Sequence, residues 1–96
     1  MQQYLITAYD FTDSEALNRR MAIRPAHLDG VRKLKQTGNF IIGGAILNPT
    51  GQMMGSSMIV AFTSEEELNS YLKTEPYLTG KVWDKVEIKP FRVAEV

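Results

Sequence analysis

Two apolar runs near the middle of the chain constrain its fold more than any other feature. They cover residues 40–47 and 53–62, and the turn-forming sequence Asn48-Pro49-Thr50-Gly51 lies between them. Apolar runs of this length on either side of a cluster of turn-forming residues are typical of two paired antiparallel strands. The sequence therefore predicts a β-hairpin at the centre of the chain.

The segment before this hairpin predicts one strand and two helical stretches. Residues 4–9 are apolar and aromatic, which is typical of a short strand. Thr12 and Glu15 have the spacing of a capping box, which predicts a short helix or turn up to about residue 22. Pro25 disfavours helical geometry at the residue before it and suits the first turn of a helix. We therefore expect a new, main helix over residues 25–37.

The segment after the hairpin predicts a helix and a final strand. Ser64 and Glu67 form a second capping box, and the helix that it opens must end at Pro76. Apolar and polar residues alternate over residues 81–89, which predicts a strand with one apolar face made by Val82, Val86 and Ile88.

The order of these elements is strand, helix, strand, strand, helix, strand. This order predicts an α+β fold of the ferredoxin-like βαββαβ type, a plait in which both helices cover one face of a four-stranded antiparallel sheet. The chain has 96 residues and shows no repeat, low-complexity tract or linker. We therefore expect a single domain over residues 1–96.

The two hairpin strands carry apolar side chains on both of their faces. These residues are Ile41, Ile42, Ile46, Leu47, Met58, Ile59 and Val60. Two helices can cover only one face of the sheet, and an apolar patch of this size is rarely left in water. We therefore expect a homodimer in which a second copy covers the helix-free face. The alternative is a monomer with an apolar open face.

Charge and composition narrow the classes of partner. Eleven basic and eleven acidic side chains cancel, so the chain presents no net positive field and we expect it to bind no nucleic acid. The N-terminus has neither a basic signal-peptide region nor an apolar stretch that could span a membrane, so no membrane partner is expected. The chain has no cysteine, which excludes disulfides and thiolate metal sites and fits a cytoplasmic location.

His27 is the only histidine and the first candidate for chemistry. At 100° per residue it falls between Val31 and Leu34, inside the apolar arc of the expected main helix. In the first turn after Pro25, the helix dipole would favour the neutral imidazole. A sheltered neutral imidazole is what a general base near neutral pH requires. The alternative is a structural histidine with a satisfied hydrogen bond.

Glu75 is the second candidate. Leu68, Tyr71 and Leu72 form the apolar stripe of the helix that opens at Ser64, and Glu75 takes the next position of that stripe. Burial and the dipole of a helix C-terminus would both raise the pKa of this carboxyl group unless a cation or a hydrogen-bond donor stabilised the carboxylate. Because the two helices lie side by side in the plait, Glu75 is in a position to meet His27 and orient it. The alternative is a frayed last turn with Glu75 in solvent.

Glycine and serine residues interrupt the hairpin strands at Gly43-Gly44 and Gly55-Ser56-Ser57. Glycine inside a strand often marks a bulge or a close approach to the backbone. In the second case Ser56 or Ser57 offers a hydroxyl group to a ligand. Bulging or tight helix packing would explain the glycines equally well.

Several of these segments together resemble the YciI-like proteins in order and spacing. The resemblance runs over nearly the whole chain and is carried by Arg24-Pro25-Ala26-His27-Leu28, Gly38, Gly55-Ser56, Glu75-Pro76-Tyr77 and Val86-Glu87-Ile88-Lys89-Pro90-Phe91. It implies a ferredoxin-like dimeric α/β barrel, similar to that of muconolactone isomerases and small cofactor-free monooxygenases. It also implies a cleft that holds a histidine and an aspartate, here His27 and the position of Glu75.

One departure bears on the site that the resemblance implies. Where the family usually has Asp-Pro-Tyr, this chain has Glu75-Pro76-Tyr77. The extra methylene moves the carboxylate by roughly an ångström, and a misplacement of that order can cost on the order of a hundredfold in rate. The pair either persists with adjusted geometry or has drifted towards binding alone.

Two functional hypotheses follow. In the first, the chain is an enzyme of lyase, dehydrohalogenase or isomerase type that needs no cofactor and acts on a small, partly aromatic or hydroxylated molecule. His27 moves a proton, Glu75 orients it, Arg24 neutralises an anionic group, and Ser56 and Tyr77 complete the cleft. In the second, the chain is a non-catalytic small-molecule-binding or interaction module.

Two further classes are poorly supported. RNA-recognition domains share this strand order but stack bases on aromatic residues of the third strand, and Met53–Val60 has neither aromatic nor basic residues. With one histidine and no cysteine, only carboxylates remain to complete a metal site, so we expect no metal.

Overall fold

The computed structural model describes all 96 residues as four strands and three helices. In chain order they are β1 (Gln2–Asp10), α1 (Ala16–Gln36), β2 (Phe40–Leu47), β3 (Met53–Phe62), α2 (Glu65–Leu72), α3 (Pro76–Thr79) and β4 (Trp83–Phe91). None of the helices combines the length and the apolarity needed to cross a membrane.

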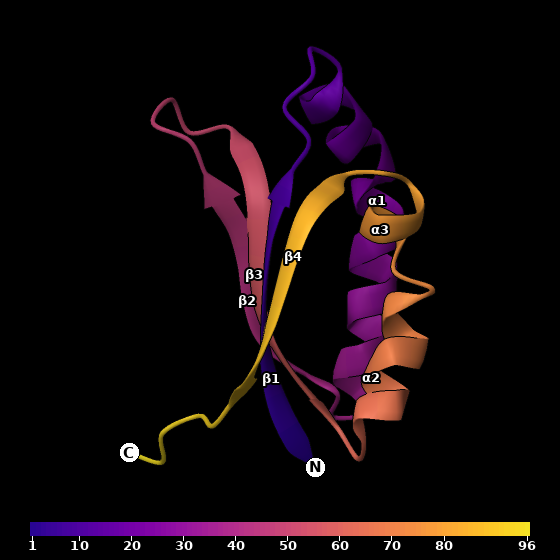
Figure 1. Cartoon of the computed structure of the whole chain (residues 1–96), viewed down its shortest axis with the longest axis vertical. Coiled ribbons are helices and arrows are strands. Elements are labelled where there is room, and N and C mark those ends of the chain that lie inside the picture. The colour runs from indigo at the N-terminus through magenta and orange to yellow at the C-terminus, as the bar shows by residue number, and fades with distance from the viewer.

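The four strands form one antiparallel sheet in the order β2-β3-β1-β4. All three helices lie on the same side of this sheet, and the other side carries no helix (Figure 1). This is the ferredoxin-like α+β plait that the order of elements predicts, and the central hairpin has the predicted bounds at both strands. The fold prediction is therefore confirmed.

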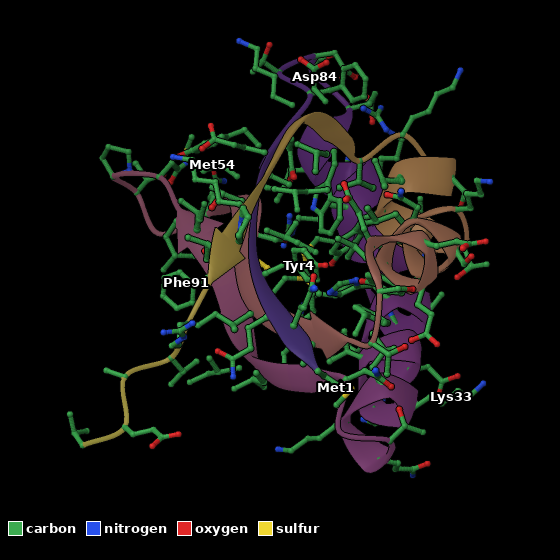
Figure 2. All side chains as sticks on the ribbon, turned by 60° about the horizontal axis from the view of Figure 1, so that its bottom comes forward. Met1, Tyr4, Lys33, Met54, Asp84 and Phe91 are labelled. Carbon is green, nitrogen blue, oxygen red and sulfur yellow. The ribbon has the colours of Figure 1, made fainter.

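The core lies between the sheet and the helices because buried and more exposed residues alternate along β1 and the middle of β3. Tyr4, Ile6 and Ala8 of β1 point to the helices and are buried, and Met58 and Val60 pair with them from β3. Figure 2 shows Tyr4 between the two layers, whereas Phe91 of β4 points away from the helices. This alternating set belongs to one apolar cluster with Leu68 of α2 and Tyr77 of α3, and burial of that cluster stabilises the fold.

The prediction of two separate helices before the hairpin is wrong. Helix α1 runs without a break through Pro25, and its N-cap is Glu15, with no side-chain capping bond from Thr12. Proline removes one backbone donor, which leaves the carbonyl group of Met21 without its helical partner. Both Pro25 and Met21 are exposed, so water can hydrate that carbonyl group and the helix continues.

The region after β3 also differs from its prediction in part. Ser64 caps α2 as expected and accepts a hydrogen bond from the Glu67 amide, but the helix already ends at Leu72. Pro76 does not only stop a helix; it occupies the first turn of the short helix α3. The last strand begins at Trp83 and not at residue 81, because Lys81 has a φ of 57° and cannot be extended.

Close packing of two strands explains why position 55 of the second hairpin strand is a glycine. A Cβ atom at this position would lie 2.5 Å from the carbonyl oxygen of Ala8 on the neighbouring strand. Only glycine therefore allows β1 and β3 to pair here without a shift of the backbone. Of the two explanations that the sequence left open, close approach of the backbone applies at Gly55.

Candidate active site

His27 and Glu75 meet between α1 and the N-terminus of α3. The Nδ1 atom of His27 lies 2.6 Å from Oε1 of Glu75. Both residues are buried, with 8% of His27 and 2% of Glu75 exposed to solvent. The contact that the sequence predicted is thus present in spite of the longer glutamate side chain, and Glu75 does not lie in solvent.

The position of Glu75 differs from its prediction, which placed it at the end of a helix. Glu75 is the N-cap of α3, and its Oε1 atom accepts a hydrogen bond of 3.1 Å from the amide of Tyr77. Its Oε2 atom accepts a bond of 2.5 Å from the hydroxyl group of Tyr71. Burial raises the pKa of Glu75, but these bonds and the contact with His27 outweigh burial and leave the pKa below its ordinary value.

These contacts determine which nitrogen of His27 is free. The Tyr77 amide can only donate, and a carboxylate with a lowered pKa accepts at both oxygens. The Nδ1 atom of His27 must therefore donate its proton to Glu75, and in the neutral imidazole the lone pair resides on Nε2. His27 also lies in the middle of α1, so the helix dipole that we expected at its first turn does not act on it.

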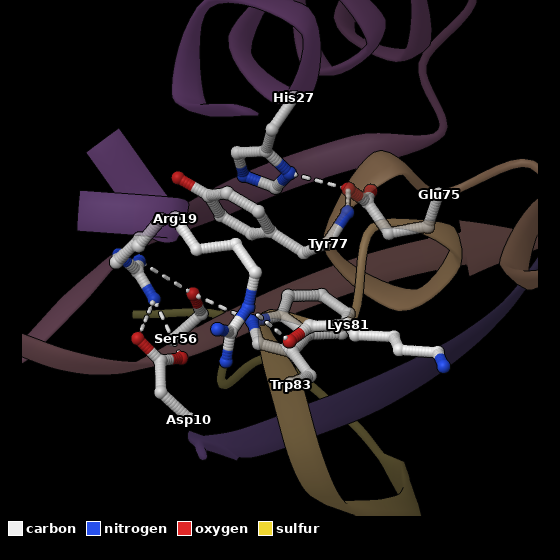
Figure 3. Close-up of polar contacts among 9 residues, drawn as sticks. Asp10, Arg19, His27, Ser56, Glu75, Tyr77, Lys81 and Trp83 are labelled. Atoms are coloured by element: carbon white, nitrogen blue, oxygen red, sulfur yellow. Dashed lines mark hydrogen bonds and ion pairs between the residues drawn. The ribbon is translucent and has the colours of Figure 1, made fainter. Parts of the chain in front are cut away.

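Tyr77 separates His27 from the guanidinium group of Arg20. The rings of His27 and Tyr77 stack at 4.0 Å with an angle of 14°, and Arg20 lies 4.6 Å from the Tyr77 ring centroid. The Tyr77 hydroxyl group lies on the side of the imidazole that faces away from Glu75 (Figure 3). This hydroxyl is buried without a hydrogen-bond partner, and burial raises its pKa, although Arg20 and Arg24 lower it in part.

A second buried polar cluster lies behind Tyr77. Nη1 of Arg20 is 2.9 and 3.1 Å from the two carboxylate oxygens of Asp10, and Nη2 donates to the Ser56 hydroxyl at 2.8 Å. Nε1 of Trp83 also donates to Ser56, at 3.2 Å. Burial raises the pKa of Asp10, and Arg20 offsets part of that rise. The cluster joins β1, α1, β3 and β4 under the site (Figure 3).

A cavity of about 190 Å³ opens between α1 and the strands β2 and β3. Arg24, His27, Leu28 and Val31 line it from the helix, and the sheet contributes Phe40, Gly43, Gly44, Ala45, Ser56, Ser57 and Met58. His27 lines this cavity and Glu75 does not. His27 therefore forms part of the cavity wall, and the carboxylate that contacts its Nδ1 atom lies outside the lining.

The structure thus brings together most of the residues singled out in the sequence. His27 and Glu75 are in contact, and Arg24 and Ser56 line the same cavity as His27. Tyr77 is different because its ring packs beneath His27 and does not line the cavity. It supports the imidazole from behind.

Sequence reasoning missed Asp10, Arg20, Tyr71 and the inward position of Trp83. A signal for Arg20 exists, since it precedes His27 by seven residues and so lies on the same face of α1. Nothing local marks Asp10 or Trp83, because each reaches the cluster from the end of a strand. No group of three or more histidine, cysteine, aspartate or glutamate side chains could hold a metal ion.

Comparison with known proteins provides a family and a set of structural neighbours. The family model of the YCII-related domain matches residues 2–92. Protein YciI of Escherichia coli O6:H1 is 33% identical over 95 residues, which cover 93% of this chain and 95% of the relative.

Two solved structures show the same fold. The 5-chloro-2-hydroxyhydroquinone dehydrochlorinase TftG of Burkholderia phenoliruptrix AC1100, in complex with 2,5-dihydroxybenzoquinone, is 24% identical with a TM-score of 0.84, covering 96% of this chain and 95% of its own. A dimeric ferredoxin-like protein of unknown function from Jannaschia sp. CCS1 is 14% identical with a TM-score of 0.55, covering 97% and 100%. At these identities the likeness establishes the fold alone.

Proposed function

The chain belongs to the YCII-related domain family, and from this premise we propose that it is a small-molecule enzyme with an acid–base pair, His27 and Glu75. The observation that carries the proposal is the contact of 2.6 Å between these side chains at the wall of a cavity. A buried carboxylate that orients an imidazole is the arrangement that general-base catalysis uses.

In the proposed reaction, Nε2 of His27 removes a proton from the bound molecule. The imidazolium ion that forms keeps its Nδ1–H bond to Glu75, and the negative carboxylate stabilises its positive charge. The same nitrogen then returns the proton to another atom, or loses it to solvent as a leaving group departs. Isomerases, lyases and dehydrohalogenases all use such a sequence of steps.

Three further residues would bind the substrate or support its binding. Arg24 lines the cavity beside His27 and would neutralise an anionic group. Ser56 presents a hydroxyl group from the sheet. Tyr77 stacks under the imidazole ring and would keep it in one plane at the wall of the cavity.

The structural neighbour TftG suggests which compounds to test first. By its description it removes hydrogen chloride from a chlorinated trihydroxybenzene and binds a dihydroxyquinone. A small, hydroxylated ring compound also suits the cavity of this chain, which combines apolar walls with Arg24, His27 and Ser56. We therefore propose hydroxylated rings of this size as the substrate class, with no cofactor.

The proposal predicts turnover of such a compound by the protein alone. We expect chloride release when the protein is incubated with 5-chloro-2-hydroxyhydroquinone under anaerobic conditions, measured with an ion-selective electrode against heat-denatured protein. Binding of 2,5-dihydroxybenzoquinone without turnover of this or related hydroxylated rings would contradict the enzyme hypothesis. That result would favour the alternative, a non-catalytic small-molecule-binding module of the same fold.

We also propose a homodimer through the helix-free face of the sheet. On this face Ile42 of β2 is 62% exposed, and Leu5, Ile46 and Ile59 are partly exposed beside it. The dimeric neighbour with the same fold supports a dimer. For the chain as a whole we propose a single domain over residues 1–96 and a cytoplasmic location.

Replacement of Ile42 with lysine is expected to dissociate this dimer, because a charge would be buried in an apolar interface. Sedimentation velocity would show a shift from the mass of two chains to that of one. Met21→Lys is the matched control, since Met21 is 47% exposed on α1, on the other side of the sheet. If both variants sediment like the unmodified protein, the proposed interface is wrong.

A further inference from the structure

The hydroxyl group of Ser56 accepts hydrogen bonds from two buried donors, Nη2 of Arg20 and Nε1 of Trp83. A guanidinium group and an indole N–H can donate but not accept. A serine oxygen has two lone pairs, and both are therefore engaged. What remains is its own proton, and no group of the chain accepts a hydrogen bond from it.

The two donors are fixed in place by their surroundings. Arg20 is 2% exposed and its other terminal nitrogen bonds both carboxylate oxygens of Asp10. Trp83 is 3% exposed and packs at the edge of the His27 and Tyr77 rings. Neither side chain can turn away without leaving a buried polar group unpaired, which is costly. The hydroxyl of Ser56 is therefore held in one hydrogen-bonding state.

The charge of Arg20 strengthens the hydroxyl as a donor. A hydroxyl group that accepts a bond from a cation is polarised, and its own O–H bond donates more strongly as a result. Ser56 lines the cavity from β3, while His27 lines it from α1. A bound molecule would thus meet a base at one wall and a polarised donor at the other.

We infer that Ser56 acts only as a hydrogen-bond donor to the ligand, held in that state by Arg20 and Trp83 as positioning residues. The ligand is then a small molecule with an acceptor oxygen, which is a carbonyl, enolate or phenolate oxygen conjugated to the group that loses its proton. This inference rests on the proposed function for the role of His27. It adds that Ser56, on the opposite wall of the cavity, selects substrates with an acceptor oxygen.

In this proton-transfer step, both the proton and the electron pair of the broken bond are accounted for. Nε2 of His27 takes the proton, and the electron pair of the broken bond stays on the ligand and is delocalised to the conjugated oxygen. That oxygen becomes more negative as the proton leaves, and the hydrogen bond from Ser56 strengthens at the same time. No electron acceptor or further reactant is needed for this step.

Binding of 2,5-dihydroxybenzoquinone to the full chain tests the inference, because this probe presents carbonyl oxygens. We expect Ser56→Ala to weaken binding by about tenfold to a hundredfold in isothermal titration calorimetry, as for a hydrogen bond to a charged group. Ser56→Thr keeps the hydroxyl and should restore binding to within about fivefold. Ser70→Ala, at an exposed serine of α2 that does not line the cavity, is the matched control and should bind like the unmodified protein.

Trp83 is the only tryptophan, so its fluorescence provides a second, independent readout. The probe should change the Trp83 emission in the unmodified protein, and the titration should give the calorimetric Kd. If the unmodified protein does not bind the probe, or if Ser56→Ala binds it as tightly, the inference is overturned.

A double-mutant cycle tests the positioning role of Trp83. Trp83→Phe keeps an aromatic ring in the core but removes the N–H donor, so one lone pair of Ser56 becomes free to accept. We expect this variant to bind the probe about fivefold more weakly, and the double variant with Ser56→Ala to bind no more weakly than Ser56→Ala alone. Additive losses would show that Trp83 acts independently of Ser56 and would overturn its positioning role.

The outcomes separate this inference from the proposed function. If a His27 variant loses turnover while Ser56→Ala keeps its affinity for the probe, the inference is wrong and the acid–base proposal stands. If Ser56→Ala loses affinity while the His27 variant keeps full turnover, the acid–base proposal is wrong and the donor role of Ser56 stands.

Discussion

Replacement of His27 with asparagine is expected to reduce turnover by about two to four orders of magnitude, the contribution of a general base, without unfolding the protein. The asparagine amide can donate a hydrogen bond to Glu75 in place of Nδ1, but it has no nitrogen lone pair that can take a proton. The measurement is initial velocity with the substrate identified by chloride release, together with the thermal unfolding midpoint of the variant.

The choice of asparagine matters because of the environment of His27. Alanine at this position would leave the Glu75 carboxylate buried next to an empty volume, which costs about 1–3 kcal/mol of stability. A loss of activity in His27→Ala would then combine a chemical and a structural effect. Full turnover by a folded His27→Asn variant would exclude His27 as the base.

Replacement of Glu75 with glutamine is expected to lower turnover by about tenfold to a hundredfold and to change how stability depends on pH. The amide oxygen can still accept from Nδ1, so the tautomer of His27 is kept, but the negative charge that stabilises the imidazolium is lost. A hydrogen bond to a charged group contributes about 1.5–3 kcal/mol, so loss of the charge-assisted bond to the imidazolium corresponds to at most this loss of rate.

The effect of pH on stability follows from the direction of the Glu75 pKa. In the folded protein this pKa lies below its ordinary value of 4.5, so the folded state holds the proton less tightly than the unfolded chain does. The ionised carboxylate therefore stabilises the fold at pH values above 4.5, and this contribution is lost as the pH falls through the folded pKa. Glutamine cannot titrate and lacks the contribution at every pH.

Chemical denaturation at several pH values measures this effect. The free energy of unfolding of the unmodified protein should exceed that of Glu75→Gln most at neutral pH, and the difference should shrink in acid. Glu75→Asp serves as the matched control because it keeps a titrating carboxylate. A difference between the unmodified protein and Glu75→Gln that stays constant from neutral to acidic pH would show that folding does not lower the pKa of Glu75, because both states would then bind its proton equally.

The architecture was largely predictable because it is encoded locally. The alternation of β1 and β3, the turn at 48–51 and the Ser64 cap each depend on residues close together in the chain, and all three are present. The predictions were wrong where solvent exposure or a neighbouring turn outweighed the local conformational preference of the residues, as at Pro25 and at residue 81. Pro25 is tolerated within α1 at a place where Pro25 and Met21 are both exposed, so water can reach the carbonyl group left unpaired, and no pattern near Pro25 predicts this exposure.

The candidate site was predictable only in part. The 100° spacing of α1 placed His27 on the inward face, and this holds although the helix begins nine residues earlier than expected. The inward position of Glu75 was predicted from an apolar stripe of the helix that opens at Ser64, but that helix ends at Leu72 and does not include Glu75. The carboxylate faces His27 because it caps α3, and only a short helix that starts at Pro76 directs it so.

By itself, the sequence determined the order of the elements, the alternating core of the sheet and the inward face that carries His27, since these depend on neighbours a few residues apart. The tertiary structure alone decided that the carboxylate of Glu75, 48 residues from His27, accepts from the Nδ1 atom of His27. It alone decided that the hydroxyl oxygen of Ser56, 36 residues from Arg20, already accepts hydrogen bonds and can only donate to a ligand. Such contacts join distant segments of the chain, and they form only when the packing of helices on the sheet brings their side chains together.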